Sequence, residues 1–413
     1  MRPPSATRLY VRRFLRARTP KVLILLFIIL NVLDVFRIHR DIAEGEKARY
    51  QLQPRPAQRL YIASMHFNNG KILRSHWIKE LIRLTDTFGA QNMFVSVHES
   101  GSWDDSKSLL RGLDRELERR AVPRRIVISD VTHKDEMLNE KKGDGWIDTS
   151  RGQRELRRIP YLARLRNEVM QDLYDMHKKG IRFDKVIFLN DVVFKVEDVM
   201  LLMDTNGGKY AAACSLDFAK PPNYYDTFAL RDSEGQAHAM QTWPYFKSFA
   251  SRSALVHNHD AVPVKSCWNG IVVMPAAPFV DENTNLRFRG IDDSLAVSHL
   301  EGSECCLIHA DNPLSKTMGV FINPRVRVAY NPTAWDDVHP RDHLWIETGD
   351  IFRGLWKNRL RRWLIWSFES WVVRGRVRAW EKAAPEGQTR KEEGEFCLIN
   401  EMQVLAENGW KHV

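Results

Sequence analysis

The chain has 413 residues, of which 28% are charged, and its five cysteines are too few for a disulfide-built scaffold. Of its net charge of +10, seven positive charges come from the first 21 residues, which contain no acid. The rest of the chain is therefore close to neutral, which removes the main argument for a nucleic-acid-binding protein.

The first structural signal is the apolar run Val22–Phe36, which follows the basic tail and is broken only by Asn31 and Asp34. Its length is close to the lower limit for a membrane-spanning helix, which is about 17 residues. A cleaved signal peptide is the alternative, with Ala43 and Gly45 at the cleavage site, but charged residues separate that site from the apolar run. The positive-inside rule then predicts a cytosolic tail (1–21), an uncleaved signal anchor (22–38), a polar stem (39–58) and a lumenal remainder.

The predicted lumenal domain spans residues 59–350, and its first half alternates short apolar strands with amphipathic helices. Such repeats imply right-handed crossovers and a parallel, Rossmann-like sheet. The absence of GxGxxG and P-loop motifs from the sequence excludes dinucleotide oxidoreductases and P-loop enzymes. The predicted strands are 60–65, 92–98, 125–129 and 186–189, and the predicted helices are 73–84, 106–120 and 151–176.

The stretch 184–217 carries the strongest chemical signal. An apolar run over 186–189 predicts a strand buried on both faces, and it ends in Asn190 and Asp191. A helix and a second strand follow, and that strand leads to Asp217. Ligands of open α/β sheets bind beyond the carboxyl ends of the strands, where both acids are expected. The acids can hold a divalent metal against a diphosphate, or Asn190 and Asp191 only cap the following turn.

Polar side chains elsewhere in the first half are candidates for the nucleotide. Glu99 and Asp130 follow two of the predicted strands and can accept hydrogen bonds from a base or a ribose, although each is also typical of an ordinary loop. Arg164 and Asn167 share one face of the predicted helix 151–176, where an arginine can bind a diphosphate. The alternative for that face is a solvated basic surface.

The second half contains short groups of aromatic and charged residues that suit a carbohydrate site. Rings stack on sugar faces, carboxylates accept from hydroxyls, and Trp268 is either a core ring or an acceptor platform. Glu304, His309 and Asp311 form a second group that can supply a metal ligand or a catalytic acid. The candidates in this half are Tyr225, Asp226, Arg231, Asp232, Trp268, Asn269, Glu304, His309 and Asp311.

Together these groups resemble one known family, the fungal capsule-associated α-1,3-mannosyltransferases (the cryptococcal mannosyltransferase family). The resemblance covers residues 60–330. It implies a GT-A-like fold, GDP-mannose as donor, a mannose-containing glycan such as mannan as acceptor, retention of the α configuration, Mn²⁺ or Mg²⁺, and a Golgi location. The segments that carry it, in order, are IFLNDVVF, AAACSLDF, YYDTFALRD, SCWNG, LRFRG, GSECC and INPRVRVAY.

The candidate residues can be given roles in such a reaction. Many GT-A enzymes end a strand in Asp-x-Asp, and the triplet here is Leu189, Asn190, Asp191, so the first acid is missing. Retention needs a carboxylate nucleophile or attack by the acceptor from the same face, and both remain open. The roles are catalysis by Glu304, Asp226 or Asp232; donor binding by Glu99, Asp130, Arg164, Asn167, Asn190 and Arg231; acceptor binding by Tyr225, Trp268 and Asn269; and metal binding by Asp191, Asp217, His309 and Asp311.

Two other functions fit the sequence: a glycosyltransferase for another sugar nucleotide, and a non-catalytic Golgi scaffold, which the missing acid would favour. Residues 351–413 are predicted to form a helical extension. Its tryptophan- and arginine-rich part, 352–380, either packs on the domain or lies on an anionic membrane surface. Residues 396–410 are predicted to be a last helix, and Cys267 is predicted to pair with Cys305 or Cys306.

Overall fold

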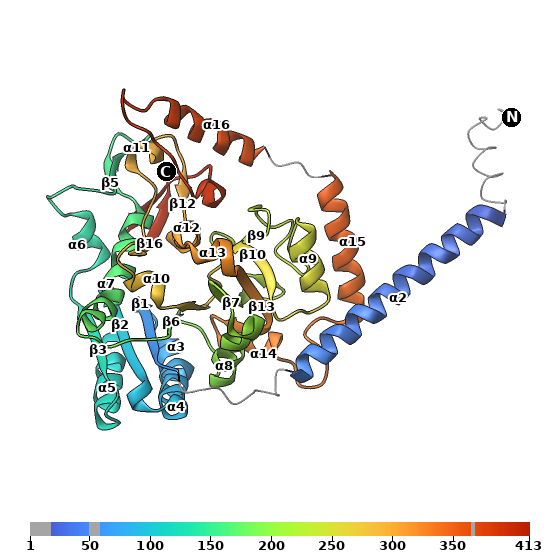
Figure 1. The fold of residues 1–413 in the computed structure, drawn as a ribbon, viewed down its shortest axis with the longest axis horizontal. Helices are drawn as coiled ribbons and strands as arrows, with labels where there is room; N and C mark the ends of the chain where they lie inside the picture. Colours follow the sequence, from blue (N-terminus) through green and yellow to red (C-terminus); the bar gives the residue numbers. More distant parts are fainter. Residues whose placement is uncertain (1–17, 49–57, 365–367) are drawn as a thin grey trace.

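The computed structural model describes residues 18–48, 58–364 and 368–413. Its centre is a ten-stranded sheet in which nine strands follow the order β3-β2-β1-β6-β11-β7-β13-β10-β9, and β8 pairs with β7 (Figure 1). The strands are β1 (Leu60–His66), β2 (Met93–Ser100), β3 (Arg124–Ser129), β6 (Lys185–Leu189), β7 (Ala212–Lys220), β8 (Asn223–Tyr224), β9 (Arg231–Asp232), β10 (Val262–Ser266), β11 (Ile271–Pro275) and β13 (Val320–Ala329).

The first half of the sheet is parallel. Strand β1 pairs in parallel with β2 and β6, and β2 pairs in parallel with β3. Strand β11 runs antiparallel between β6 and β7, so β7 has the same direction as β6. The carboxyl ends of β1, β2, β3, β6 and β7 therefore lie along one edge, where ligands of open α/β sheets bind. The predicted α/β class with a Rossmann-like half is confirmed.

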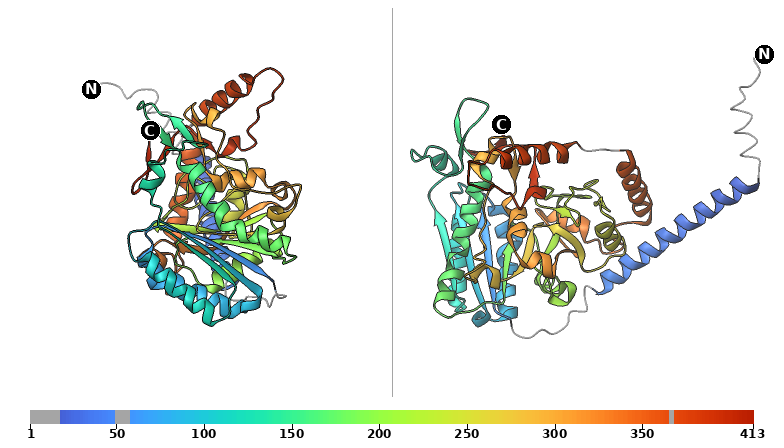
Figure 2. Two further views of the ribbon diagram at one scale, coloured as in Figure 1. Left: turned by 90° about the vertical axis from the view of Figure 1, so that its left-hand side faces the viewer. Right: turned by 45° about the horizontal axis from the view of Figure 1, so that its top comes forward.

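Helices cover both faces of this sheet (Figure 2). Along β1, Leu60 and Ile62 pack on one face, in a core shared with α4, α5 and α8, whereas Tyr61 and Ala63 pack on the other face with α7. The helices of the domain are α3 (Gly70–Ile72), continued by a π-turn (Leu73–Trp77) and α4 (Ile78–Phe88); α5 (Ser106–Arg119), α6 (His133–Met137), α7 (Arg158–Lys178), α8 (Val196–Asp204), α9 (Phe249–Val256), α10 (Ala277–Val280), α11 (Asp293–Ala296), α12 (Glu304–Asp311), α13 (Leu314–Met318) and α14 (Pro332–Val338).

Some element ends differ from the sequence prediction. Strand β7 continues to Lys220 because it pairs with β13 as far as Phe218 and then with β8, so Asp217 lies within the strand. Strand β2 continues to Ser100 because it pairs there with β3, which places Glu99 inside the sheet. The predicted helix 151–176 begins only at Arg158, since the short strands β4 (Trp146–Asp148) and β5 (Arg154–Leu156) precede it.

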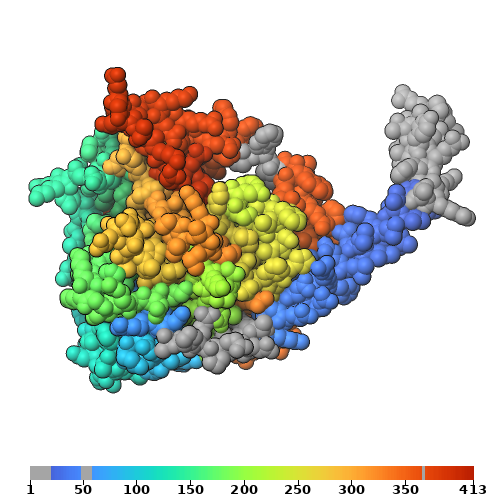
Figure 3. All heavy atoms as spheres, in the orientation of Figure 1, coloured from blue at the N-terminus to red at the C-terminus, as the bar shows by residue number. Residues whose placement is uncertain are grey.

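The N-terminal helix α2 (Arg18–Ala48) is one continuous helix of 31 residues. It is the one described helix that is long and apolar enough to cross a membrane, with a mean hydropathy of 2.2 over its most apolar window, 11% of which is buried. Side chains between Val22 and Phe36 are largely exposed, and α2 projects away from the domain (Figure 3).

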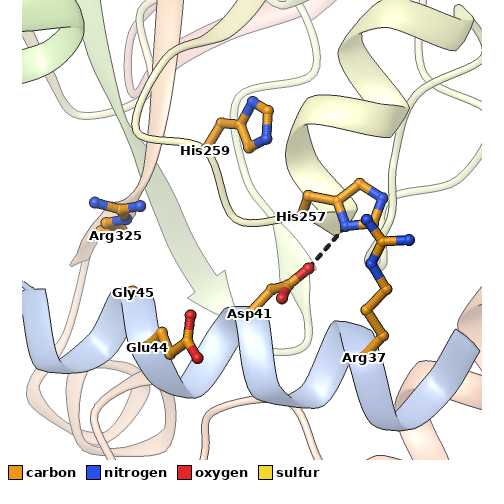
Figure 4. Close-up of a pocket in the computed structure, with 7 residues that line it drawn as sticks. All are labelled: Arg37, Asp41, Glu44, Gly45, His257, His259 and Arg325. Carbon is orange, nitrogen blue, oxygen red and sulfur yellow. Dashed lines mark hydrogen bonds and ion pairs between the residues drawn. The ribbon is translucent and has the colours of Figure 1, made fainter. Parts of the chain in front are cut away.

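The second half of α2 does not form the polar stem that the sequence predicts. Ile38 and Ile42 are each 2% exposed and belong to the main core, and Gly45 lies against Asn258, where a Cβ would clash. The carboxylate of Asp41 accepts from His257 at 2.8 Å beside a cavity of 520 Å³ (Figure 4).

An ion pair with a buried arginine completes this junction. Glu46 accepts two hydrogen bonds from the guanidinium of Arg327, at 2.7 and 2.9 Å, and the Arg327 side chain is 1% exposed. Arg327 also donates to the carbonyls of Pro324 and Val338. Residues as far as Ala48 are therefore helical, and the described part of the predicted stem packs as an integral part of the domain.

The C-terminal segment returns to the domain in three pieces. Helix α15 (Thr348–Leu364) contacts α2, and α16 (Glu369–Lys382) packs through Val373 and Val377 on a small core with α11 and α12. The predicted last helix is wrong, because that segment contains a 3₁₀ turn (Glu395–Cys397) and the strands β14 (Leu398–Ile399), β15 (Gln403–Ala406) and β16 (Gly409–His412). Strand β14 pairs with β12 (Glu301–Gly302), and β15 and β16 form a hairpin.

The disulfides also differ from the prediction. Cys267 pairs with Cys214 rather than with Cys305 or Cys306, because β11 brings the turn that precedes it beside β7. Cys306 pairs with Cys397 and so ties α12 to the C-terminal segment, and Cys305 is free and buried.

Candidate active site

Asp191 lies at the carboxyl edge of the sheet, immediately after β6. The backbone amide of Asn190 donates to the carbonyl of Gly270 at 3.0 Å, which fixes the direction in which the chain leaves the strand. The Asp191 carboxylate accepts from Asn69 Nδ2 at 2.7 Å and stays partly exposed. Burial raises the pKa of Asp191 to about 6. The end of β6 therefore presents an acid that carries a desolvated charge at neutral pH.

Asp217 is fully buried in β7. One carboxylate oxygen accepts from Asn269 Nδ2 at 2.9 Å and the other from the Tyr330 hydroxyl at 3.2 Å. Burial, and then the nearby Asp226 carboxylate, raise the pKa of Asp217 to about 7. The structure thus brings together two residues that the sequence assigned to different roles, Asp217 and Asn269.

The turn Trp268-Asn269-Gly270 must pass very close to these strands. Asn269 has φ 47° and Gly270 has φ 90°, both in the left-handed region. A Cβ on Gly270 would lie 2.5 Å from Val328 Cγ2 and 3.3 Å from Asp217 Cβ. Glycine is therefore required here, and its position lets Asn269 reach Asp217.

Asp226 and Glu304 extend the acidic cluster. Asp226 is half-buried, and one of its oxygens accepts from the amides of Phe228 and Ala229 at 3.1 and 3.0 Å. Burial raises its pKa, and the charge of Glu304 contributes in the same direction. Glu304 is the first residue of α12, is buried, and accepts from Arg166 Nε at 2.9 Å. We define the acidic cluster as Asp191, Asp217, Asp226 and Glu304.

Two arginines of α7 that the sequence analysis did not select lie beside this cluster. Arg166 pairs with Glu304, and its guanidinium carbon lies 4.5 Å from the ring centroid of Trp268. Arg158 is the first residue of α7 and interacts electrostatically with Glu304 and Asp226. Burial lowers the pKa of Arg158 although the nearby acids raise it. The basic composition of the RRIP segment was the available signal, but nothing local identified its acidic partners.

The C-terminal hairpin reaches the same place. Arg158 donates to Gln403 Oε1 at 2.6 Å, and its guanidinium carbon lies 4.6 Å from the ring centroid of Trp410. The predicted acceptor residue Tyr225 is 57% exposed, and its ring centroid lies 4.6 Å from that of Tyr330. Exposed aromatic rings are therefore available near the acids, as a sugar acceptor requires.

A second cluster lies at the carboxyl ends of β1, β2 and β3. One oxygen of buried Glu99 accepts from the Ser102 amide, whereas Glu99 Oε2 and the Nδ1 atom of His133 are buried without a hydrogen-bond partner. The Phe67 ring stacks on His133 with centroids 4.1 Å apart and meets the exposed Trp103 at 5.3 Å. Buried polar atoms without partners are costly, so this cluster suits a ligand that supplies donors.

Several predicted site residues have structural partners instead. The Arg231 guanidinium donates to five backbone carbonyls, including those of Phe396 and Cys397. The Asp232 carboxylate accepts from three backbone amides at 2.8 to 3.0 Å, those of Glu234 and Gln236 in the turn after β9 and that of Ser248 before α9. Both side chains are buried, and these contacts hold the loops around β9 and the C-terminal segment in place.

The remaining predicted site residues are also engaged by structural contacts or lie away from the acidic cluster. Trp268 is 2% exposed and packs in the core, which leaves no face for an acceptor. Asp311 pairs with Arg289, and Asp130 is exposed beside Lys107. The other three also have structural partners: His309 Nε2 donates to the Cys267 carbonyl, Arg164 pairs with Glu136 and Glu168, and Asn167 binds both backbone groups of Phe288.

His309 gives a first prediction, about pH. Burial lowers its pKa to about 4, so between pH 6.5 and 4 the unfolded chain binds a proton at His309 that the folded chain does not. The free energy of unfolding should therefore decrease as the pH is lowered through this window, by up to about 1.4 kcal/mol per pH unit for this group. His309→Gln keeps a donor for the Cys267 carbonyl and should flatten the acid limb in denaturant titrations. An unchanged slope would contradict a buried neutral His309.

The acidic cluster fits a divalent cation in part. Among the residues that the structure describes, Asp191, Asp217 and Asp226 form no direct ion pair. The guanidinium groups of Arg158 and Arg166 interact with Asp226 only at longer range. Mn²⁺ and Mg²⁺ prefer carboxylate oxygens and often take one or two of them plus substrate phosphates. Within the described ranges no three His, Cys, Asp or Glu side chains are grouped so as to hold a metal by themselves. This donor set fits a metal that is bound together with a diphosphate.

A Rossmann-like sheet with an acidic cluster at its carboxyl edge and an adjacent group of rings is the arrangement that a glycosyltransferase requires. Residues 59–311, more than half of the chain, match the family profile described as Cryptococcal mannosyltransferase 1, and the chain belongs to this family. A search of curated protein sequences finds no match.

Solved structures with related folds share little sequence with this chain. *Staphylococcus aureus* TarS residues 1–349 are 10% identical with a TM-score of 0.34, over 74% of this chain and 72% of TarS. GalNAc-T7, solved with UDP, GalNAc and Mn²⁺, is 11% identical with a TM-score of 0.38, over 66% of this chain and 43% of its own. The mannosyltransferase PcManGT from Pyrobaculum calidifontis, solved with GDP-Man and Mn²⁺, is 10% identical with a TM-score of 0.32, over 86% of this chain and 88% of its own.

Proposed function

We propose that the chain transfers mannose from GDP-mannose to a mannose-containing glycan, forming an α-1,3 linkage with retention. The observation that carries this proposal is the set of three acids without ion-pair partners, Asp191, Asp217 and Asp226, at the carboxyl edge of a Rossmann-like sheet in a mannosyltransferase family member. Such a set suits a cation and a sugar diphosphate better than it suits a structural core.

We assign metal and diphosphate binding to Asp191, Asp217 and Arg158. Asp191 would hold Mn²⁺ or Mg²⁺, and Asp217 would complete the site or orient Asn269. A bound divalent metal neutralises negative charge on the diphosphate as it leaves. Arg158 can donate to the same diphosphate, because it faces the acids from the N-terminus of α7.

Asp226 and Glu304 are the carboxylates that we propose near the anomeric carbon. Asp226 Oδ2 is held only by the Asn269 amide at 3.5 Å, which leaves it able to reach a substrate. Glu304 pairs with Arg166 and would stabilise positive charge on the sugar. Tyr225 would stack on the acceptor sugar. Asp232 and Arg231 have no part in this scheme, since backbone groups engage them.

Glu99 would read the base of the donor. Guanine presents an N1–H and an N2 amino group side by side, and the buried Glu99 Oε2 lacks a donor. Trp103, with 56% of its surface exposed, can stack on the purine. Asp130, Arg164 and Asn167 have other partners, and we place none of them on the donor.

We further propose a single-pass type II Golgi membrane protein, with residues 1–21 in the cytosol and the domain in the lumen. The length and composition of α2 support a span, and the seven basic residues among residues 1–21 support this orientation.

The test is nucleotide release by the purified full-length chain in detergent, with GDP-mannose and a panel of UDP-sugars, with and without Mn²⁺. We expect metal-dependent GDP release that is selective for GDP-mannose. Glu99→Gln should raise KM for GDP-mannose about tenfold or more, because one guanine donor loses a charged acceptor. Asp130→Asn is the matched control and should change nothing. Selective release from a UDP-sugar would identify a different glycosyltransferase, and a folded chain that binds no sugar nucleotide would identify a scaffold.

A further inference from the structure

Helix α15 is joined to the apolar half of α2. The Trp356 ring centroid lies 5.4 Å from that of Phe27, and Trp356 Nε1 donates to Asn31 Oδ1 at 3.1 Å. Arg359 pairs with Asp34 at 3.5 Å. The two polar residues that interrupt the apolar run thus both find their partners on α15. These contacts hold α15 beside residues 27–34 of α2.

The surface where α15 ends and α16 begins is apolar, aromatic and basic. Leu360, Trp363, Leu364 and Trp371 are 48%, 68%, 78% and 72% exposed. Exposed basic residues accompany them: Lys357, Arg361, Arg374 and Arg378. We call Leu360, Trp363, Leu364 and Trp371 the α15–α16 corner. Large exposed apolar side chains beside Arg and Lys are typical of surfaces that lie in the interfacial layer of a bilayer.

The position of this corner agrees with its composition. Helix α15 stands between the body of the domain and the projecting half of α2, and the contacts between α15 and α2 confirm that the two helices lie side by side (Figure 3). The other end of α16 packs away from α2, through Val377 and Trp380 on the small core with α11. The apolar side chains are therefore concentrated at the end of the C-terminal segment that is nearest to α2.

We propose that the α15–α16 corner lies in the headgroup layer of the bilayer that α2 crosses, with its basic side chains at the level of the lipid phosphates. This inference rests on the membrane span proposed above. Two contacts with the lipid, α2 and the corner, would then hold the domain against the membrane. Aromatic rings and long basic side chains reach the interface together, with the rings among the acyl-chain ends and the charges at phosphate level.

The test is site-directed spin labelling of the full chain in lipid nanodiscs, with single labels at Leu25→Cys, Trp363→Cys and Lys79→Cys. Leu25 is an exposed residue of α2, and Lys79 is an exposed residue of α4. Accessibility to oxygen and to a water-soluble nickel chelate gives the depth of each label. We expect labels 25 and 363 to be shielded from the chelate several-fold better than label 79. Adding phosphatidylserine should shield label 363 further, and Arg361→Gln should reduce that gain.

Each outcome decides one point. A label at 363 that is as open to the chelate as the label at 79, with label 25 shielded, would overturn the lipid contact and leave the span intact. A label at 25 that is open to the chelate would remove the span and the inference together. Neither outcome depends on transferase activity, so the proposed reaction is tested separately.

Discussion

Replacing Asp191 with asparagine is expected to lower kcat/KM for GDP-mannose by about 10²–10³-fold or more, because one charged ligand of the diphosphate-bound cation is lost. The amide oxygen of the new side chain can still accept from Asn69, so the turn after β6 should keep its shape. Nucleotide release by the full-length variant over a range of Mn²⁺ concentrations measures the effect. The apparent Mn²⁺ requirement should rise in the same variant.

The same substitution should stabilise the fold. The pKa of Asp191 is raised to about 6 in the folded chain. The protonated carboxyl group therefore stabilises the folded state relative to the ionised one. Its contribution to the free energy of unfolding falls as pH rises from about 4 to 6, and at pH 7 the ionised group is destabilising. Asp191→Asn should therefore raise Tm by a few degrees at pH 7 and by less at pH 4. An inactive variant with a lowered Tm at pH 7 would instead indicate damage to the fold.

Replacing Glu46 with glutamine is expected to lower the free energy of unfolding by about 3 kcal/mol, because it leaves the buried charge of Arg327 without a counter-ion. The carbonyls of Pro324 and Val338 would remain its acceptors, but they carry no charge. Denaturant unfolding of the full chain in detergent measures the loss. Glu44→Gln is the matched control, since Glu44 lies two residues away, is exposed and pairs only with exposed Arg40.

If Glu46→Gln and Glu44→Gln unfold alike, the junction between α2 and the domain contributes no measurable stability. The expected result has a practical counterpart. A soluble fragment that begins at residue 59, where the sequence alone places the domain, would lack Ile38, Ile42 and Glu46. Such a fragment should be far less stable than the whole chain.

The sequence predicts the parallel half of the fold well because local patterns determine it. The apolar run before Asn190 is short, buried on both faces and ends in polar residues, and the structure has a strand there. Its alternation with amphipathic helices then limits the topology. The second half is less regular, and β13 and the C-terminal hairpin depend on pairings that no local pattern shows.

Half of the candidate site could be predicted in the same way. Asp191 and Asp217 follow or lie in strands that point to one edge, so the strand rule identifies them. Arg158 was missed because its partners Glu304 and Gln403 lie far along the chain. Asp232, Arg231 and His309 have the right chemistry for a site, but backbone groups engage them, and only coordinates show that. The pairing of Cys214 with Cys267 likewise needs the position of β11.

Because α2 is one continuous helix, it fixes the rotation of the domain about the helix axis as well as the distance between the domain and the apolar half of α2. Each residue of an α-helix turns the chain by about 100° and advances it by about 1.5 Å. Adding one residue after Phe36 would therefore rotate the whole domain by more than a quarter turn about the helix axis. Adding four residues would almost restore its original orientation. The carboxyl edge of the sheet therefore has a fixed orientation relative to the apolar half of α2. A substrate must therefore reach the acidic cluster from a direction that is fixed relative to the apolar half of α2.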